Sequence, residues 1–205
     1  MQKESYSTRA VFETTTPDHV DYTLRRFSTT EYFRMGEAGI LQETDRVELI
    51  DGEILVREPE GSQHASHVHE IAALFYHLRN TGRAIVRTNH PAILDDFNVP
   101  QPDVAVVKWR DDRYVHAHPT PADILLAIEV SWTTLLQDRG IKAPLYARAG
   151  IPELWIVDLK SRHVEVYREP SRAGYASFAR FGIGSTLRPH SFEDVALRVD
   201  DLLLL

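Results

Sequence analysis

Three acids and one lysine could carry out chemistry together, because each lies in or beside a short apolar segment. They are Glu48, Asp103, Glu129 and Lys142. Glu129 interrupts the apolar run of residues 124–130, and an ionised carboxylate is costly to bury there unless it is paired or binds a metal. Two such acids on neighbouring strands would form a site for a hard divalent cation. A nearby lysine could then orient a water molecule or balance a phosphate.

Length and composition limit the class of protein. The chain has 205 residues, of which 43% are hydrophobic and 26% charged, and these values predict a single globular domain with a sizeable core. No apolar stretch is long enough to span a bilayer, and residues 1–21 lack the apolar core of a signal peptide. We therefore expect a cytoplasmic protein without a membrane partner. The absence of cysteine excludes disulfides, zinc-thiolate sites and a cysteine nucleophile.

The formal net charge of −7 argues against a protein that coats nucleic acid by bulk electrostatics. A local basic groove remains open, because an acidic metal site itself adds negative charge where a phosphate must approach. Ordinary solvated surface charge is the simpler interpretation of any single arginine. The candidates for such a groove are Arg79, Arg83, Arg87, Arg139 and Arg148.

Local signals predict the elements that must position the acids. Residues 28–31 have the capping-box spacing that begins a helix. Asp51 and Gly52 predict a tight turn between two strands, the first of which carries Glu48. The predicted helices span residues 28–39, 63–80 and 134–149, and the predicted strands span residues 46–50, 53–57, 84–88, 92–94, 103–108, 124–130, 153–158, 163–167 and 175–181, followed by a strand or turn ending at residues 202–205.

The order of these elements indicates an α/β (α+β) fold in which helices flank a mixed central β-sheet. Residues 27–205 form the single predicted domain. Residues 1–26 show little periodicity, and we expect them to be a loosely ordered extension or to pack on a partner.

Five motifs follow one another along the chain: residues 46–53 (RVELIDGE), 101–104 (QPDV), 128–131 (IEVS), 138–142 (DRGIK) and 146–158 (YARAGIPELWIVD). Each motif alone is a weak signal, but five in this order are specific. Together they resemble the Uma-type (DUF820-like) restriction endonuclease family, a bacterial branch of the PD-(D/E)xK nuclease superfamily. The resemblance covers about residues 27–205.

This resemblance implies a restriction-endonuclease-like core and a metal-dependent endonuclease that hydrolyses DNA phosphodiester bonds. Asp103 and Glu129 would bind Mg²⁺, or Mn²⁺ in its place, together with the backbone carbonyl of Val130. Glu48 would be a further ligand of the metal or of water. The cation would neutralise charge on the scissile phosphate and lower the pKa of a bound water. By analogy with enzymes that cut two strands, we expect a homodimer.

The lysine of the superfamily motif is displaced in this chain. The general motif has a lysine two residues after the second acid, and Ser131 stands there. The family supplies the lysine from the following helix, where Lys142 is the matching residue. A long flexible side chain can reach the same point from a neighbouring element. Asp138, Lys142 and Tyr146 would share one helix face, although Pro144 should start or kink that helix.

Each candidate also has a purely structural interpretation. Asp103 follows a proline and could cap a turn. Glu48 could be an exposed strand acid paired with an arginine of its own hairpin. Lys142 could be a surface lysine paired with an acid one helical turn away, which contributes only a few tenths of a kcal/mol.

Three histidines, His64, His67 and His69, lie near the start of the second predicted helix. They lack the His-Glu spacing of zinc peptidases, so a solvated helix end is the simpler interpretation. His64 matches a family position near the site. It is therefore a candidate supporting residue, as are Ser131 and Tyr146.

Two other functions remain open at the level of sequence. The first is a nuclease-derived fold kept as a binding or regulatory module, for which the acidic composition suits protein contacts. The second is a nuclease that acts on RNA or on branched or single-stranded DNA. The intact acids favour an enzyme over the first alternative.

Overall fold

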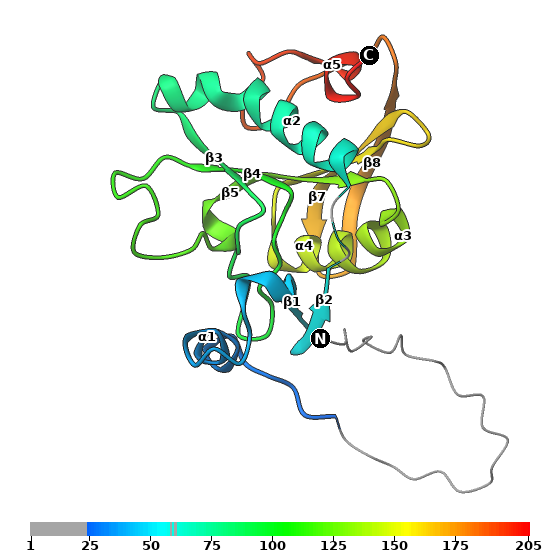
Figure 1. The fold of residues 1–205 in the computed structure, drawn as a ribbon. Coiled ribbons are helices and arrows are strands. Elements are labelled where there is room, and N and C mark those ends of the chain that lie inside the picture. Colours follow the sequence, from blue (N-terminus) through cyan, green and yellow to red (C-terminus); the bar gives the residue numbers. More distant parts are fainter. Residues whose placement is uncertain (1–23, 58, 60) are drawn as a thin grey trace, which may run out of the picture.

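The computed structural model describes residues 24–57, 59 and 61–205. Within these residues a mixed six-stranded sheet has the order β3-β4-β5-β6-β7-β8 (Figure 1). β5 and β6 are parallel, and the other neighbours are antiparallel. The strands are β3 (Ala84–Thr88), β4 (Val104–Lys108), β5 (Ile124–Ser131), β6 (Glu153–Asp158), β7 (His163–Ser171) and β8 (Gly174–Gly182).

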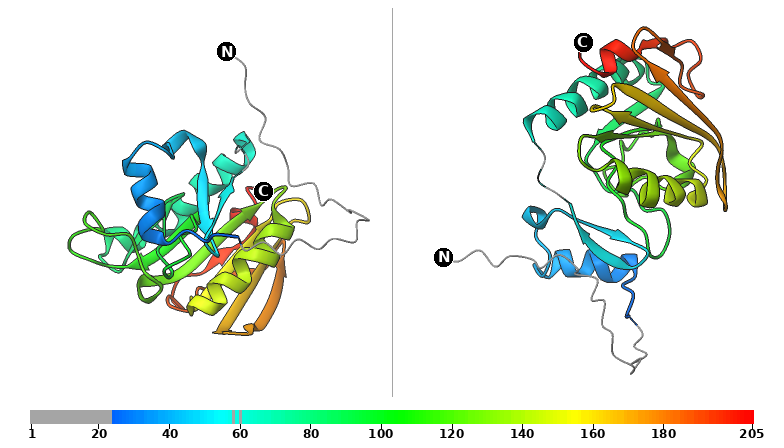
Figure 2. Two further views of the ribbon diagram at one scale, coloured as in Figure 1. Left: turned by 90° about the horizontal axis from the view of Figure 1, so that it is seen from below. Right: turned by 90° about the vertical axis from the view of Figure 1, so that its right-hand side faces the viewer.

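Helices cover both faces of this sheet (Figure 2). α2 (Ser62–Asn80) lies over one face, and α4 (Ala143–Ala149) lies over the other. Alternation along the central strands provides an apolar side chain for each helix: Val106 of β4 packs in the cluster under α2, and Val107 packs in the cluster under α4. The predicted mixed sheet flanked by helices is confirmed.

A small unit stands apart from the main sheet, below it in Figure 1. It contains α1 (Thr29–Glu37), the short 3₁₀ helix η1 (Glu43–Asp45) and the hairpin of β1 (Val47–Ile50) and β2 (Glu53–Val56). Ser28 and Glu31 form the predicted capping box of α1. The hairpin turn is also as predicted, since Gly52 has a φ of 77° that favours glycine. The unit is tied to the main domain by the bridge between Leu49 and Val99.

One predicted strand is wrong. Residues 92–94 belong to a loop, in which Ala92 N–H donates to the Pro100 carbonyl and Leu94 N–H donates to the Asn98 carbonyl. Ile93 N–H donates to the Pro119 carbonyl, so the segment lies outside the main sheet. The C-terminus, predicted to be a strand or a turn, ends in the helical turn α5 (Val199–Leu202), which packs on α2. It follows the paired two-residue strands β9 (Thr186–Leu187) and β10 (Leu197–Arg198).

The extension predicted over residues 1–26 lies outside the described residues, apart from residues 24–26, which form no helix or strand. Among the described residues no helix is both long and apolar enough to cross a membrane.

Candidate active site

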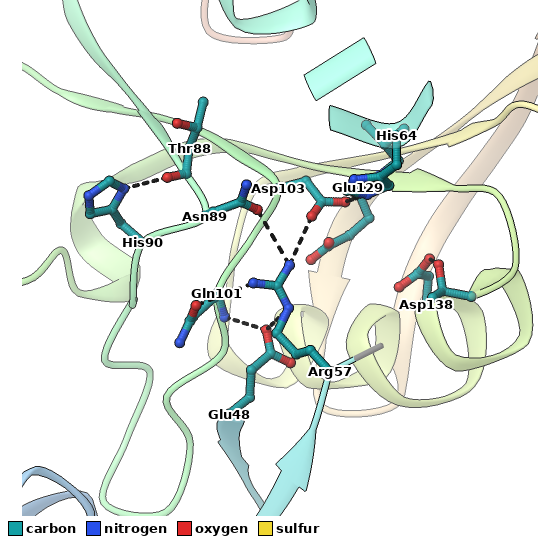
Figure 3. A network of polar contacts seen from close by, with 12 residues as sticks. Glu48, Arg57, His64, Thr88, Asn89, His90, Gln101, Asp103, Glu129 and Asp138 are labelled. Atoms are coloured by element: carbon teal, nitrogen blue, oxygen red, sulfur yellow. Dashed lines mark hydrogen bonds and ion pairs between the residues drawn. The ribbon is translucent and has the colours of Figure 1, made fainter. Parts of the chain in front are cut away.

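The three acids approach one another because of strand order. Asp103 directly precedes β4, and β4 is antiparallel to β5, so the start of β4 lies beside the end of β5 that carries Glu129. Beyond the last paired residues of β4 and β5, Val130 N–H donates to Asp103 Oδ2 at 2.8 Å. Both polar backbone groups of a strand residue point to the same side, so the Val130 carbonyl also faces Asp103. Figure 3 shows Asp103 and Glu129 side by side.

Glu48 lies on β1 of the separate hairpin. Its Oε1 accepts the backbone N–H of Gln101 at 2.8 Å, and Gln101 Nε2 donates to the Val47 carbonyl at 3.1 Å. These bonds fix the residues just before Asp103 to β1. The Glu48 side chain is 1% exposed and lies at the lower edge of the site in Figure 3.

Lys142 joins the acids from an unusual helix. The predicted helix over residues 134–149 is present, but in three parts: α3 (Leu135–Gln137), a π-helical segment η3 (Asp138–Lys142) and then α4. Pro144 has no N–H to donate to Gly140, and Ala143 N–H donates instead to the Asp138 carbonyl, five residues back. The widened turn brings Lys142 Nζ to 3.0 Å from Glu129 Oε2 and 3.5 Å from Glu48 Oε1.

Glu129 is buried and has a donor on each oxygen. Tyr146 Oη donates to Oε1 at 2.6 Å, and Lys142 Nζ donates to Oε2 at 3.0 Å. Burial raises the pKa of Glu129 to about 8, and the charge of Lys142 only partly opposes this. For Lys142 itself burial alone would lower the pKa, but the surrounding carboxylates, led by Glu129, raise it above its usual value. Lys142 therefore stays charged, and Glu129 ionises at a higher pH than an ordinary glutamate.

Asp103 has a different environment. Its Oδ1 accepts from Arg57 Nη2 at 3.1 Å, and its Oδ2 lies 3.1 Å from His64 Nε2 in addition to the Val130 N–H. Burial would raise the pKa of Asp103, but the contact with His64, the charge of Lys142 and the Val130 N–H together lower it. Asp103 therefore carries a negative charge when Glu129 does not.

Ser131 does not take the place of the missing lysine. Its Oγ donates to Asp138 Oδ2 at 2.6 Å, and Thr134 Oγ1 donates to the same oxygen at 2.7 Å. Burial raises the pKa of Asp138. Ser131 thus ties the end of β5 to the start of η3, the segment that presents Lys142.

The acids Glu48, Asp103, Glu129 and Asp138 line a cavity of about 480 Å³ together with Lys142. None of the five arginines predicted to form a basic groove is among its lining residues. Arg83, Arg139 and Arg148 instead form ion pairs with acids elsewhere, namely Asp194, Glu165 and Asp51.

The residues fit a hard divalent cation in part. Asp103, Glu129 and the Val130 carbonyl provide oxygen ligands of the kind that Mg²⁺ and Mn²⁺ accept. In the described part of the chain no group of three or more His, Cys, Asp or Glu side chains is arranged to hold a metal ion. Glu48 Oε1 is paired with Lys142 and, at 3.7 Å, with Arg57. The fit therefore rests on Asp103, Glu129 and one carbonyl, and the ligand roles of these groups and of Glu48 stay predictions.

The sequence analysis missed Arg57 as a partner of Asp103. Its side chain is only 14% exposed, and it contacts Glu48, Asp103, Asn89 and Gln101. The signal was available, because Glu48 pairs with Leu55 across the hairpin and strand alternation puts Arg57 on the same face. His67, in contrast, lies outside the site and contacts the carbonyls of Gln63 and Leu203.

Comparisons with known proteins identify a family and a fold. The family model Uma2, described as "Putative restriction endonuclease", matches residues 29–200. A solved structure, that of a putative nuclease belonging to DUF820 from Anabaena variabilis, shares the fold with a TM-score of 0.68 and 15% sequence identity, over 87% of this chain and 98% of that one. None of the curated proteins compared matches the chain.

Proposed function

The chain belongs to the Uma2 family, and from this premise we propose that it is a metal-dependent endonuclease that hydrolyses phosphodiester bonds in DNA. The family and the fold point to a nuclease. The observation that carries the finer proposal is the convergence of Asp103, Glu129 and Lys142 in one cavity, on elements far apart in the sequence.

Asp103, Glu129 and the Val130 carbonyl are the groups proposed to hold the cation, with Glu48 as a further ligand of the metal or of water. Mg²⁺ or Mn²⁺ there would neutralise charge on the scissile phosphate and favour ionisation of the attacking water. Glu129 accepts hydrogen bonds from both Tyr146 and Lys142, which fix the direction of its carboxylate.

Lys142 is proposed to hold the attacking water or to balance the phosphate. The Lys142 side chain is 7% exposed, lines the cavity and contacts both Glu129 and Glu48. Its charge is therefore held where the local dielectric constant is low. His64 and Tyr146 are positioning residues in this scheme, because each contacts one of the two acids.

Cleavage of covalently closed circular DNA tests the proposal, because a closed circle can be cut only internally. The wild type is incubated with Mg²⁺ or Mn²⁺ and with supercoiled plasmid or single-stranded circles. We expect cutting that falls at least about a hundredfold in Asp103→Asn and in Glu129→Gln. Asp194→Asn, whose carboxylate pairs on the surface with Arg83, is the matched control and should cut like the wild type. Failure of the wild type to cut any of these circles with either metal would refute the proposal.

A binding or regulatory module is the second candidate. It is favoured by one observation: Arg57 already neutralises Asp103 and Glu48, so the described site has internal counter-charges for two of its acids. In that case the protein should bind nucleic acid or a protein partner without cutting, and the Asp103→Asn variant should bind as the wild type does.

We also propose, by analogy with endonucleases that cut both strands of a duplex, that the protein acts as a homodimer. Sedimentation velocity across a range of protein concentrations should show a dimer, and a monomer at all concentrations would contradict this part of the proposal.

A further inference from the structure

A second cavity lies beside the candidate active site. It has a volume of about 530 Å³, within the roughly 300–1,000 Å³ typical of ligand pockets. Its lining includes residues of α1 and β1 and residues 88–91, which form the end of β3 and the segment after it. Arg57 lines both cavities, and Figure 3 shows its guanidinium between Asp103 and Asn89. The two cavities are therefore neighbours with one arginine between them.

The two cavities differ in charge. The active-site cavity is lined by four acids, Glu48, Asp103, Glu129 and Asp138. The described lining of the second cavity contains no Asp or Glu and includes Arg46 and Arg57. In a chain with a net charge of −7, an acid-free cavity directly beside the catalytic acids is a suitable place for an anionic strand.

Its remaining walls suit a nucleobase. Phe33 lines the cavity with an aromatic ring that also stacks on His118, with 5.5 Å between the ring centroids, and a base can lie against the aromatic surface that this stack leaves. Asn89 and Gln101 provide amides, and the oxygens of both accept hydrogen bonds from Arg57, at 3.4 and 3.2 Å. Because these contacts orient both amides, the hydrogen-bonding groups of the wall are fixed before a ligand enters.

The backbone of the cavity wall is also held in an uncommon conformation. Arg46 and Asn89 have φ angles of 52° and 51°, in the left-handed region. Such residues persist where the surrounding structure determines the conformation, and they are frequent at ligand sites. Both lie on the wall of this cavity.

We propose that the second cavity binds one unpaired nucleotide of the strand being cut, next to the phosphate that lies at the catalytic acids. A base in a duplex cannot enter this cavity without leaving its stack. The preferred substrate is therefore single-stranded DNA, or DNA with unpaired nucleotides at the cut. This inference rests on the proposed function and names the substrate class of that site.

Gly36 allows the cavity to be filled without removing any contact. It lies in α1 on the cavity wall, its φ is not in the left-handed region, and a Cβ added there meets no atom within 4 Å. Gly36→Phe should occupy the cavity, while Gly36→Ala is the matched control, because it changes the backbone preference in the same way but leaves the cavity open. Circular dichroism and thermal melting establish that both variants fold.

Binding is measured without metal, in EDTA, by the fluorescence anisotropy of a labelled oligodeoxythymidine and of a labelled hairpin duplex. We expect Gly36→Phe to weaken binding of the single strand at least about tenfold, and Gly36→Ala to bind like the wild type. Duplex binding should be the same in all three proteins. Equal single-strand binding by Gly36→Phe and Gly36→Ala would overturn the inference.

A second variant guards against misfolding of Gly36→Phe. Phe33→Leu keeps an apolar side chain but removes the aromatic face, and single-strand binding should fall by about tenfold. Unchanged binding in Phe33→Leu would also contradict the inference. Because no cutting occurs in EDTA, binding that depends on the cavity supports the inference even if the wild type never cuts. Cutting of circles that is insensitive to Gly36→Phe would instead remove this inference alone.

Discussion

Lys142 Nζ lies 3.0 Å from Glu129 Oε2, although the two residues are 13 positions apart in the sequence. The lysine comes from a π-helical turn, and the acid comes from the central strand β5. Short π-helical turns within α-helices are frequent at functional sites, because they shift the side chains of the helix out of their regular positions. The π-helical turn thus places a charged amine beside Glu129, and we propose that this amine serves in place of the lysine that the general motif has at residue 131.

Replacing Lys142 with methionine tests its role. Lys142→Met should lower the cutting rate at least about a hundredfold, because the charged donor beside the attacking water is lost. Binding of Mg²⁺ should be kept, since no oxygen ligand is removed. The measurements are the rate of circle cutting and the heat of Mg²⁺ binding.

Lys108→Met is the matched control for this change, because the Lys108 side chain is exposed at the end of β4. It should cut at the wild-type rate. A Lys142→Met variant that cuts as fast as Lys108→Met would exclude the lysine from the reaction.

Metal binding should depend on pH through Glu129. The carboxyl has a pKa of about 8 because of burial, so below that pH a cation must displace a proton. We therefore expect the affinity for Mg²⁺ to rise as pH increases towards about 8, with proton release below it. Calorimetry in buffers of different ionisation enthalpy measures the released proton directly.

The same shift predicts the stability of the metal-free protein. The pKa of Glu129 in the folded state lies above its ordinary value of 4.5, so the folded state retains a proton that the unfolded state has lost. This contribution is fully present below pH 4.5 and is lost as the pH rises through about 8. Urea unfolding should show this decline in the wild type and in Glu70→Gln, an exposed control, but less of it in Glu129→Gln.

An affinity for Mg²⁺ that does not change with pH would contradict the assignment of Glu129 as a metal ligand with a raised pKa.

We expect Arg57 to compete with a cation for the acids. Its guanidinium lies 3.1 Å from Asp103 Oδ1 and 3.7 Å from Glu48 Oε1. Arg57→Gln should bind Mg²⁺ about tenfold more tightly, an effect of ~1.4 kcal/mol, and its metal-free form should be less stable by about 1–3 kcal/mol. Calorimetry and urea unfolding measure the two effects.

Arg148→Gln is the control for Arg57, because the Arg148 pair with Asp51 is exposed and contributes little. It should change neither quantity by more than about 1 kcal/mol. If Arg57→Gln bound Mg²⁺ more weakly than Arg148→Gln, the two cations would not share the same acids.

Glu165 should control stability in acid. It is fully buried on β7 and accepts from Arg139, Arg180 and Tyr167. Burial opposes its ionisation, but these donors lower its pKa to about 2. The stability that this group contributes is present above pH 4.5, the ordinary pKa of a glutamate, and is lost as the pH falls through about 2.

Glu165→Gln should therefore flatten the loss of stability between about pH 4.5 and 2, while Glu70→Gln should leave it unchanged. Urea unfolding across this range is the measurement. Because Arg139 belongs to η3, the variant should also loosen the segment that carries Lys142, and faster hydrogen exchange there is expected. Identical acid profiles for both variants would show that Glu165 contributes no charge effect.

Much of the main sheet could be predicted from the sequence, since its strands have continuous apolar runs bounded by turns. The predicted strand over residues 84–88 has the same limits as β3. The segment of residues 92–94 was wrongly predicted as a strand because its backbone N–H groups donate to the carbonyls of Asn98, Pro100 and Pro119, contacts that no local pattern encodes. The C-terminus was left as a strand or a turn because four consecutive leucines suit a strand as well as a helix.

The site could be predicted in its members but not in its contacts. The types and order of Asp103, Glu129 and Lys142 were sufficient to select them, and the structure brings all three together. The π-helical turn was only hinted at by Pro144, because hydrogen-bond spacing is not visible in the sequence. The contact of Arg57 with Asp103 joins a separate hairpin to the main sheet, and so depends on how the two units pack.

Calorimetric titration of Mg²⁺ and of Mn²⁺ into the wild type, Asp103→Asn, Glu129→Gln and the control Asp194→Asn tests the central claim most directly, because it needs no substrate. The account predicts that the wild type and Asp194→Asn bind the metals equally, and that binding is lost in both site variants. Absence of metal binding in the wild type, or equal binding in all four proteins, would contradict the claim that Asp103 and Glu129 hold the cation.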